Sequence, residues 1–331
     1  MAHLEIVVLR TAMRLLLRVL LALVLAVMVL GLVLTTIGAF YQPNTQIPAG
    51  LLGQHVSVQG LPIRVYQRGT GPDVLLIHGS PGSVEDFAPI FSALGTRFRL
   101  TAYDRPGHGF SGDSGKYSLA DNAEVADTLL AQLDLHDAIV VGHSYGGATA
   151  LALALRNPAR AKAFVVLDSA TYAPLRALSP LYKVLSVPYF GIGAASVLGA
   201  FIAPTRIRDE LRQIWPSAPE DFITLRTRIW SNPKVSHALA RESLGARGAL
   251  SAQSPRYPEI AQRVSILAQA HDPERKHTAE RLHRDIAGST LDLLPDTGHY
   301  LQFEKPAEVV RAIEDLAPQP QEDEEAENEE L

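Results

Sequence analysis

The most restrictive feature of this 331-residue chain is a Gly-x-Ser-x-Gly motif at residues 142–146, centred on Ser144. An apolar run, 138–141, precedes the motif, and an alanine- and leucine-rich run typical of a helix, 148–155, follows it. In this context a strand turns sharply into a helix, and only small residues fit beside the serine. The helix N-terminus directs backbone N–H groups and partial positive charge at that point. The motif therefore predicts a strand–turn–helix unit with Ser144 as a candidate nucleophile.

Apolar strands and helices alternate on both sides of this unit. After a hairpin over residues 55–67, we expect strands at 74–77, 98–103, 138–141, 164–167, 264–268 and 290–294. Helices are expected at 84–94, 118–133, 148–157, 278–286 and 306–316. Apolar strands that alternate with helices form a parallel sheet that is covered on both faces. The pattern predicts an α/β fold.

The alternation is interrupted between residues 171 and 262. This stretch lacks strand signals, is mostly helical in pattern, and contains many proline, glycine and arginine residues. We interpret it as a helical cap inserted over the C-terminal edge of the sheet, between two parts of one core, 54–170 and 263–317. The segment 318–331 carries seven acidic residues, all after position 321, and is predicted to be a disordered tail.

The N-terminal region predicts a membrane anchor over residues 1–40. Residues 19–40 are uncharged and long enough to cross a bilayer, and Arg10, Arg14 and Arg18 precede them. Because no charge follows until Arg64, the positive-inside rule predicts a cytoplasmic N-terminus and a body on the periplasmic or extracellular side. A cleavable signal peptide is the competing interpretation, although its apolar segment is usually shorter and no clear small-x-small site follows. Residues 41–53 are interpreted as a linker.

Composition excludes several classes of function. The formal net charge is −5, and without the seven acidic residues of the tail it becomes −5 + 7 = +2. Such a body has no basic stripe, so nucleic-acid binding is not predicted. The chain contains no cysteine, which excludes disulfides, thiolate metal sites and a cysteine nucleophile. No metal or organic cofactor is expected.

Two residues downstream of Ser144 complete a candidate catalytic triad. A serine hydroxyl needs a base that takes its proton, and that base needs an orienting acid. Asp272 follows the strand 264–268, and His299 follows the last strand, 290–294. Both therefore belong to the edge where parallel sheets place their sites. We predict His299 as the base and Asp272 as the acid.

Two backbone N–H groups are predicted to form an oxyanion hole, because a tetrahedral intermediate needs such donors. One is Tyr145, directly after the candidate nucleophile. The other belongs to the His-Gly-Ser-Pro-Gly loop at residues 78–82, which follows the strand 74–77. Ser80 is the predicted donor of this loop, since Pro81 has no N–H.

Together these motifs resemble the α/β-hydrolase superfamily over roughly residues 52–317. The resemblance rests on the loop 78–82, the run Asp-Arg-Pro-Gly-His-Gly-Phe-Ser at 104–111, the motif at 142–147, Asp272, and Gly298 with His299. It implies a mostly parallel, eight-stranded sheet with a helical cap. Some relatives take the acid from an earlier strand, which makes Asp168 the alternative acid. Epoxide hydrolases and haloalkane dehalogenases look similar but use an aspartate where this chain has Ser144.

The predicted reaction is hydrolysis of a carboxylic ester through an acyl-enzyme. Perhydrolase or haloperoxidase-like chemistry and carbon–carbon bond hydrolysis remain alternatives within the resemblance. A non-catalytic ligand receptor on the same fold is an alternative of another class.

The cap contains an apolar run at 184–203, within a stretch without charge from 184 to 205. Such a run is most often a helix packed on the core. The second interpretation is an apolar gate that touches the bilayer and receives a lipophilic substrate. Nearby arginines would then suit anionic headgroups; these are Arg206, Arg208, Arg212, Arg226 and Arg228.

Overall fold

The computed structural model describes residues 2–173 and 178–318. Its centre is an eight-stranded sheet in the order β1-β2-β4-β3-β5-β6-β7-β8. Only β2 runs antiparallel to its neighbours, and all other pairs are parallel. The strands are β1 (Gln54–Val58), β2 (Leu61–Arg68), β3 (Asp73–Ile77), β4 (Arg99–Tyr103), β5 (Ala138–His143), β6 (Ala161–Leu167), β7 (Arg263–Gln269) and β8 (Thr290–Leu294). The predicted fold class is confirmed.

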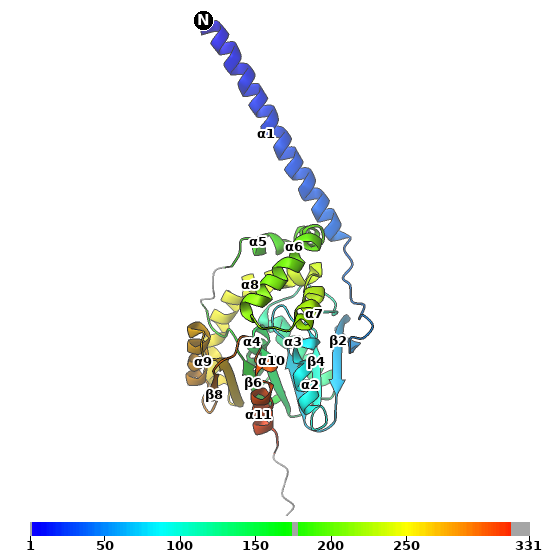
Figure 1. Cartoon of the computed structure of the whole chain (residues 1–331), viewed down its shortest axis with the longest axis vertical. Helices are drawn as coiled ribbons and strands as arrows, with labels where there is room; N and C mark the ends of the chain where they lie inside the picture. The colour runs from blue at the N-terminus through cyan, green and yellow to red at the C-terminus, as the bar shows by residue number, and fades with distance from the viewer. Residues whose placement is uncertain (1, 174–177, 319–331) are drawn as a thin grey trace, which may run out of the picture.

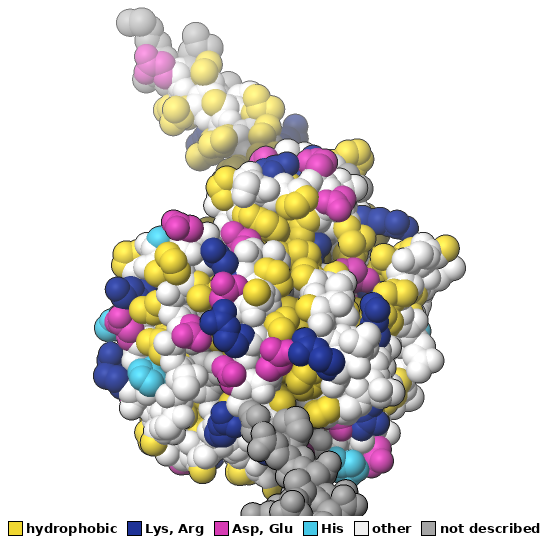
Figure 2. All heavy atoms as spheres, turned by 60° about the horizontal axis from the view of Figure 1, so that its bottom comes forward, with side chains coloured by type: hydrophobic (Ala, Val, Ile, Leu, Met, Phe, Trp, Pro, Cys, Tyr) yellow, Lys and Arg dark blue, Asp and Glu magenta, His cyan; other side chains and the backbone are white. Residues whose placement is uncertain are grey.

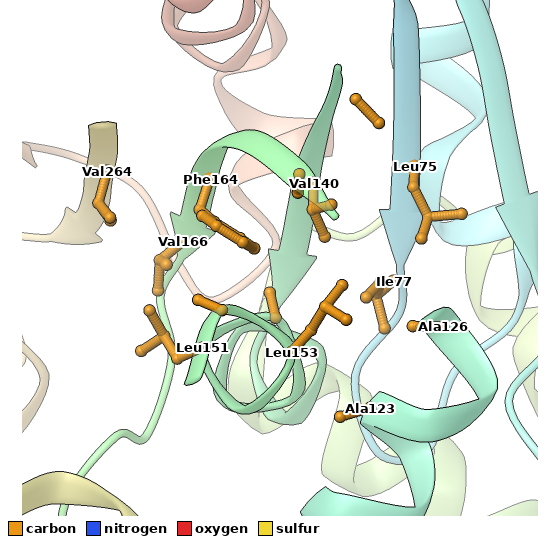
Figure 3. Packing of buried hydrophobic residues seen from close by; sticks show 14 of the residues in the cluster. Leu75, Ile77, Ala123, Ala126, Val140, Leu151, Leu153, Phe164, Val166 and Val264 are labelled. Carbon is orange, nitrogen blue, oxygen red and sulfur yellow. The ribbon is translucent and has the colours of Figure 1, made fainter. Parts of the chain in front are cut away.

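Helices cover both faces of the sheet because side chains along each strand alternate between the faces. In β3, Leu75 and Ile77 join the core under α3 (Leu119–Gln132), α4 (Tyr145–Arg156) and α9 (Pro273–Asp285). Figure 3 shows side chains of this first core between the strands and α3 and α4. Val74 and Leu76 face α2 (Ala88–Leu94) and α11 (Pro306–Leu316) on the other side. A short helix, α10 (Leu301–Glu304), precedes α11.

Local chemistry sets the boundaries of several elements. The β1–β2 turn places Gln59 at φ 51° and Gly60 at φ 82°, the two positive φ angles of a tight hairpin turn. Ser118 caps α3 by accepting a hydrogen bond from Asp121 N. The helix predicted over 84–94 is divided into a 3₁₀ turn, η1 (Val84–Phe87), and α2. Pro89 lies in the first turn of α2, where its missing N–H costs nothing.

The interruption between β6 and β7 forms a layer of helices over the sheet (Figure 1). Its elements are α5 (Leu181–Leu185), α6 (Phe190–Ile214), α7 (Glu220–Trp230), α8 (Pro233–Gln253) and the 3₁₀ turn η2 (Ser254–Glu259). Helix α6 bends by 86° between Phe190–Val197 and Phe201–Ile214. The bend lies near Gly199 and Pro204, and both residue types favour kinks.

The N-terminal helix α1 (Ala2–Ala39) projects away from the globular part, and its C-terminal end meets the cap (Figure 1). It begins before the predicted apolar segment and includes the three arginines. Within the described residues it is the one unbroken helix long and apolar enough to cross a membrane, from Val8 to Ala39. The acidic tail lies outside the described residues from position 319 onward.

Candidate active site

Ser144 occupies a strained turn between β5 and α4, as its motif predicted. Its backbone angles are φ 54° and ψ −119°, and its N–H donates to Leu167 O at 2.9 Å. A Cβ atom on Gly142 would overlap the carbonyl group of Gly146, and one on Gly146 would overlap that of Ile77. Glycine is therefore required at both positions by close backbone approach.

The carboxylate partner of His299 is Asp168, which follows β6. His299 Nδ1 and Asp168 Oδ2 are 2.5 Å apart, and Asp168 is only 1% exposed. The same carboxylate accepts hydrogen bonds from Gln269 N at 3.3 Å and Gln269 Nε2 at 2.9 Å. An ionised carboxylate can only accept, so Nδ1 donates the proton and Nε2 carries the lone pair that a general base needs.

Electrostatics favours a charged Asp168 beside a neutral His299. Burial by itself raises the pKa of the Asp168 carboxyl, but the hydrogen bond from His299, the Arg275 guanidinium and the hydrogen bond from Gln269 favour the charged form and lower the pKa to about 2. The pKa of His299 is lowered by burial and by the Arg275 guanidinium, which outweigh the opposite effect of Asp168. The imidazole can therefore accept a proton near neutral pH.

The preferred acid of the sequence analysis, Asp272, occupies a different structural position. Asp272 caps α9, and its Oδ1 accepts hydrogen bonds from Glu274 N at 2.9 Å and Arg275 N at 3.3 Å. Although it lines the same cavity as His299, the geometry favours Asp168 as the acid. The sequence held the relevant signal, because aspartate followed by proline is a typical helix start. The same cap explains why α9 begins earlier than predicted.

The two predicted oxyanion donors lie beside Ser144. A Cβ atom on Gly79 would be 3.1 Å from Ser144 Cβ, so the loop after β3 contacts the nucleophile turn. Tyr145 is the first residue of α4. Neither the Ser80 nor the Tyr145 N–H donates a hydrogen bond to another described residue. Two free donors at a helix N-terminus and a neighbouring loop can stabilise a developing oxyanion.

Arg105, which sequence reasoning missed, binds the backbone of the loop 78–82. Its buried guanidinium donates to His78 O at 3.1 Å and Gly79 O at 2.8 Å. The charge is balanced by an ion pair with Glu242 of the cap helix α8. His108 also contacts Glu242, at 3.2 Å. The Arg-Pro-Gly run at 105–107 lies within a motif that indicates the family, but the burial of its arginine cannot be read from the sequence.

A second contact fixes the loop that carries His299. His143 Nε2 lies 2.8 Å from His299 O, and the two rings are 4.6 Å apart between centroids. Burial lowers the pKa of His143 to about 3, so its ring is neutral and Nε2 can donate to this carbonyl. His143 therefore positions the loop that carries His299.

Ser144 and His299 open into a cavity of about 1120 Å³ between the sheet edge and the cap. Its cap side is largely apolar, and side chains from α5, α6 and α8 line it. This volume exceeds the roughly 300–1000 Å³ typical of small-molecule sites. Among residues 2–173 and 178–318, no group of three or more His, Asp or Glu side chains is placed to hold a metal ion.

Most cap arginines are engaged with acidic groups of the protein. Arg226 is 2% exposed and pairs with Asp86 at 2.8 Å, and Arg208 and Arg212 both pair with Glu220. Burial removes Arg226 from any surface that could meet anionic headgroups. Arg208 and Arg212 share one carboxylate and their side chains are 43% exposed, so for them, as for Arg206 and Arg228, the headgroup contact stays a prediction.

Comparison with known proteins identifies the family. Residues 74–312 match the model of the alpha/beta hydrolase family. The chain belongs to this family. It is 26% identical over 273 residues to the 2-(acetamidomethylene)succinate hydrolase of Mesorhizobium japonicum, covering 79% of this chain and 94% of the relative. It is 24% identical over 263 residues to a putative esterase/lipase of Haemophilus influenzae, covering 76% and 84%. Among solved structures, an alpha/beta hydrolase fold protein from Burkholderia ambifaria superposes with TM-score 0.67 at 22% identity, covering 80% and 98%.

Proposed function

We propose that this chain is a serine hydrolase that cleaves carboxylic esters through an acyl-enzyme. The observation that carries the proposal is the 2.5 Å contact between His299 and Asp168 on the cavity that Ser144 lines. A nucleophile, a base and an orienting acid in this relation are the minimum for acyl transfer. The family and relatives named as hydrolases and esterases support the same reaction class.

In the proposed mechanism Ser144 Oγ forms a bond to the ester carbonyl carbon while His299 Nε2 takes its proton. The N–H groups of Ser80 and Tyr145 stabilise the oxyanion. The alkoxide leaves with the proton from His299, which gives an alcohol and an acyl-serine. Water then attacks the acyl carbon and gives a proton to His299. The bond between the acyl carbon and Ser144 Oγ breaks, Oγ takes that proton back from His299, and the acid is released. Asp168 stays ionised and stabilises the imidazolium of His299 both when the acyl-enzyme forms and when it is hydrolysed.

Labelling with a fluorophosphonate probe and hydrolysis of p-nitrophenyl butyrate test this proposal. Wild-type protein is expected to become labelled at Ser144 and to hydrolyse the ester. Ser144→Ala is expected to lose labelling and about 10⁴-fold or more of kcat, while its circular dichroism spectrum stays unchanged. Equal activity in both proteins would overturn the mechanism. Absence of labelling with intact folding would favour the receptor, and peroxide-dependent halogenation would favour the haloperoxidase-like alternative.

We further propose that α1 anchors the chain in a membrane with its N-terminus in the cytoplasm. Its length and composition and the three arginines before position 19 support this. Full-length protein is then expected to stay with membranes after carbonate washing, with its N-terminus protected from added protease in spheroplasts. Recovery of a soluble chain that starts near residue 40 would show a cleaved signal peptide instead.

A further inference from the structure

The membrane helix and the cap are in direct backbone contact. A Cβ atom on Gly38 of α1 would overlap the carbonyl group of Tyr189, just before α6. A Cβ atom on Gly193 of α6 would overlap the carbonyl group of Leu34 and lie 3.2 Å from Gly38 N. Reciprocal glycines of this kind allow two helices to pack at backbone distance, as in membrane helix pairs. The contact fixes where α6 lies along α1.

This contact sets the depth of the cap relative to the bilayer. From Arg18, the last basic residue before the apolar segment, to Gly38 the helix advances 38 − 18 = 20 positions. At 1.5 Å per residue this is about 30 Å, the thickness of the hydrocarbon core. With Arg18 at the cytoplasmic boundary, Gly38 and the first half of α6, Phe190–Val197, lie at the opposite boundary.

The segment between α1 and β1 holds this arrangement in place. Tyr41 donates a hydrogen bond to Asn232 Oδ1 at 2.6 Å, and Lys234 donates to Asn44 O at 3.1 Å. Ile47 and Leu51 pack against the apolar cluster of the cap. Residues 41–53, predicted as a linker, therefore form an arm that is bound to the cap.

The cap surface near α1 is apolar and exposed. Phe201 is 83% exposed, and Val184, Val187, Val197 and Ile202 are 41–48% exposed. No charged residue occurs from 184 to 205. The end of the molecule turned away from α1 differs, because basic and acidic side chains are interspersed there (Figure 2). An uncharged apolar surface at the predicted bilayer boundary has the chemistry of a membrane contact.

The same surface continues into the active-site cavity. Leu178, Leu181, Val184 and Ile202 are at least 36% exposed and also line the cavity that contains Ser144. An apolar path therefore leads from the predicted bilayer boundary, past α5 and α6, to the nucleophile.

We propose that the apolar surface of α5 and α6 rests in the leaflet on the body's side, and that an amphiphilic ester with a long acyl chain reaches Ser144 directly from that leaflet. The inference rests on the proposed esterase function and adds the substrate class and its route. The glycine contact between α1 and α6 acts as the positioning device, since it holds the opening of the cavity at the lipid boundary.

The position of α6 can be measured without reference to activity. Because the chain has no cysteine, Phe201→Cys gives a single nitroxide-labelling site. Ser92→Cys gives a control site on α2, which lies in the part of the molecule away from α1 (Figure 1). In phosphatidylcholine vesicles, the label at position 201 is expected to be relaxed by oxygen and protected from a water-soluble nickel chelate. The label at position 92 should show the opposite preference. Equal exposure of both labels to the chelate would overturn the membrane contact.

The route is tested by two substrates and a matched pair of variants. Full-length protein in the same vesicles is given p-nitrophenyl palmitate, which dissolves in the bilayer, or water-soluble p-nitrophenyl acetate. Gly38→Leu should separate α1 from α6 and lower kcat/KM for the palmitate about tenfold or more, with little change for the acetate. Gly31→Leu is the control, because nothing lies within 4 Å of a Cβ at that position of α1. It should leave both activities unchanged.

The outcomes separate this inference from the proposed function. If Gly38→Leu retains palmitate hydrolysis, the inferred route is wrong and the esterase function stands. If wild-type protein hydrolyses neither ester and is not labelled by a fluorophosphonate, the esterase function and the inference that rests on it both fail. Loss of palmitate hydrolysis in Gly38→Leu alone supports the route from the leaflet.

Discussion

The exchange Asp168→Asn tests the most specific feature of the site, the acid that His299 contacts. In wild-type protein the carboxylate orients Nδ1–H through a 2.5 Å contact and carries a negative charge. Asparagine keeps the size and can still bond to Gln269, so the cavity should keep its shape. It removes the charge and permits the wrong imidazole tautomer, in which Nε2 holds the proton and cannot accept another.

The magnitude follows from the charge pair that forms when Ser144 transfers its proton. The imidazolium and the carboxylate then lie about 4 Å apart between charge centres, and at an effective dielectric constant of about 20 their attraction is about 4 kcal/mol. Loss of that stabilisation lowers kcat about 10³-fold, and the wrong tautomer adds up to about a further tenfold. Because the ester does not contact Asp168 in the proposed mechanism, KM should change little.

The assay is p-nitrophenyl butyrate hydrolysis by full-length protein, with Asp272→Asn as the matched control. Asparagine caps helices about as well as aspartate, so α9 should remain intact in the control. We expect Asp272→Asn to retain kcat within about threefold, a change below 1 kcal/mol. An equal or larger loss in Asp272→Asn than in Asp168→Asn would refute the reasoning and return the role of the acid to Asp272.

Two further predictions concern charges around the site. Arg275→Gln removes a cation that lowers the pKa of His299, so the acid limb of kcat/KM should shift to higher pH. Arg284→Gln, nine residues further along α9, serves as the control. An unchanged limb would contradict the assigned cause. Glu242→Gln leaves the buried Arg105 unpaired and should lower the free energy of unfolding in urea by about 3–5 kcal/mol. The pKa of Glu242 is depressed to about 2, because Arg105 and His108 outweigh the effect of burial, so this contribution is present above pH 4.5 and lost toward pH 2. Equal unfolding midpoints at neutral pH would show that the pair contributes nothing.

Local sequence was sufficient where a single element dictates its own structure. The motif at 142–146 requires a strained turn because glycine alone fits against the backbones on both sides of it. Strand and helix periods predicted the succession of strands and helices along the chain, and the last helix matches its predicted bounds, Pro306–Leu316. Such features depend on neighbours a few residues away, which a sequence displays directly.

Features that join distant segments were decided by the tertiary structure. Asp168 and Asp272 both follow parallel strands and both lie between Ser144 and His299 in the chain, so their order along the sequence could not choose between them. The choice depends on the pairing of β6 with β7, where Asp168 N donates to Leu267 O at 2.8 Å, and on the helix start that engages Asp272.

The sequence by itself therefore determined the fold class, the nucleophile turn and the apolar N-terminal segment. Tertiary structure decided which acid lies beside His299, the burial of Arg105 against the loop 78–82, and the glycine contact between the cap and α1. The physical reason is range: strand, turn and helix preferences act over a few residues, whereas a buried charge or a backbone contact exists only after distant segments have packed.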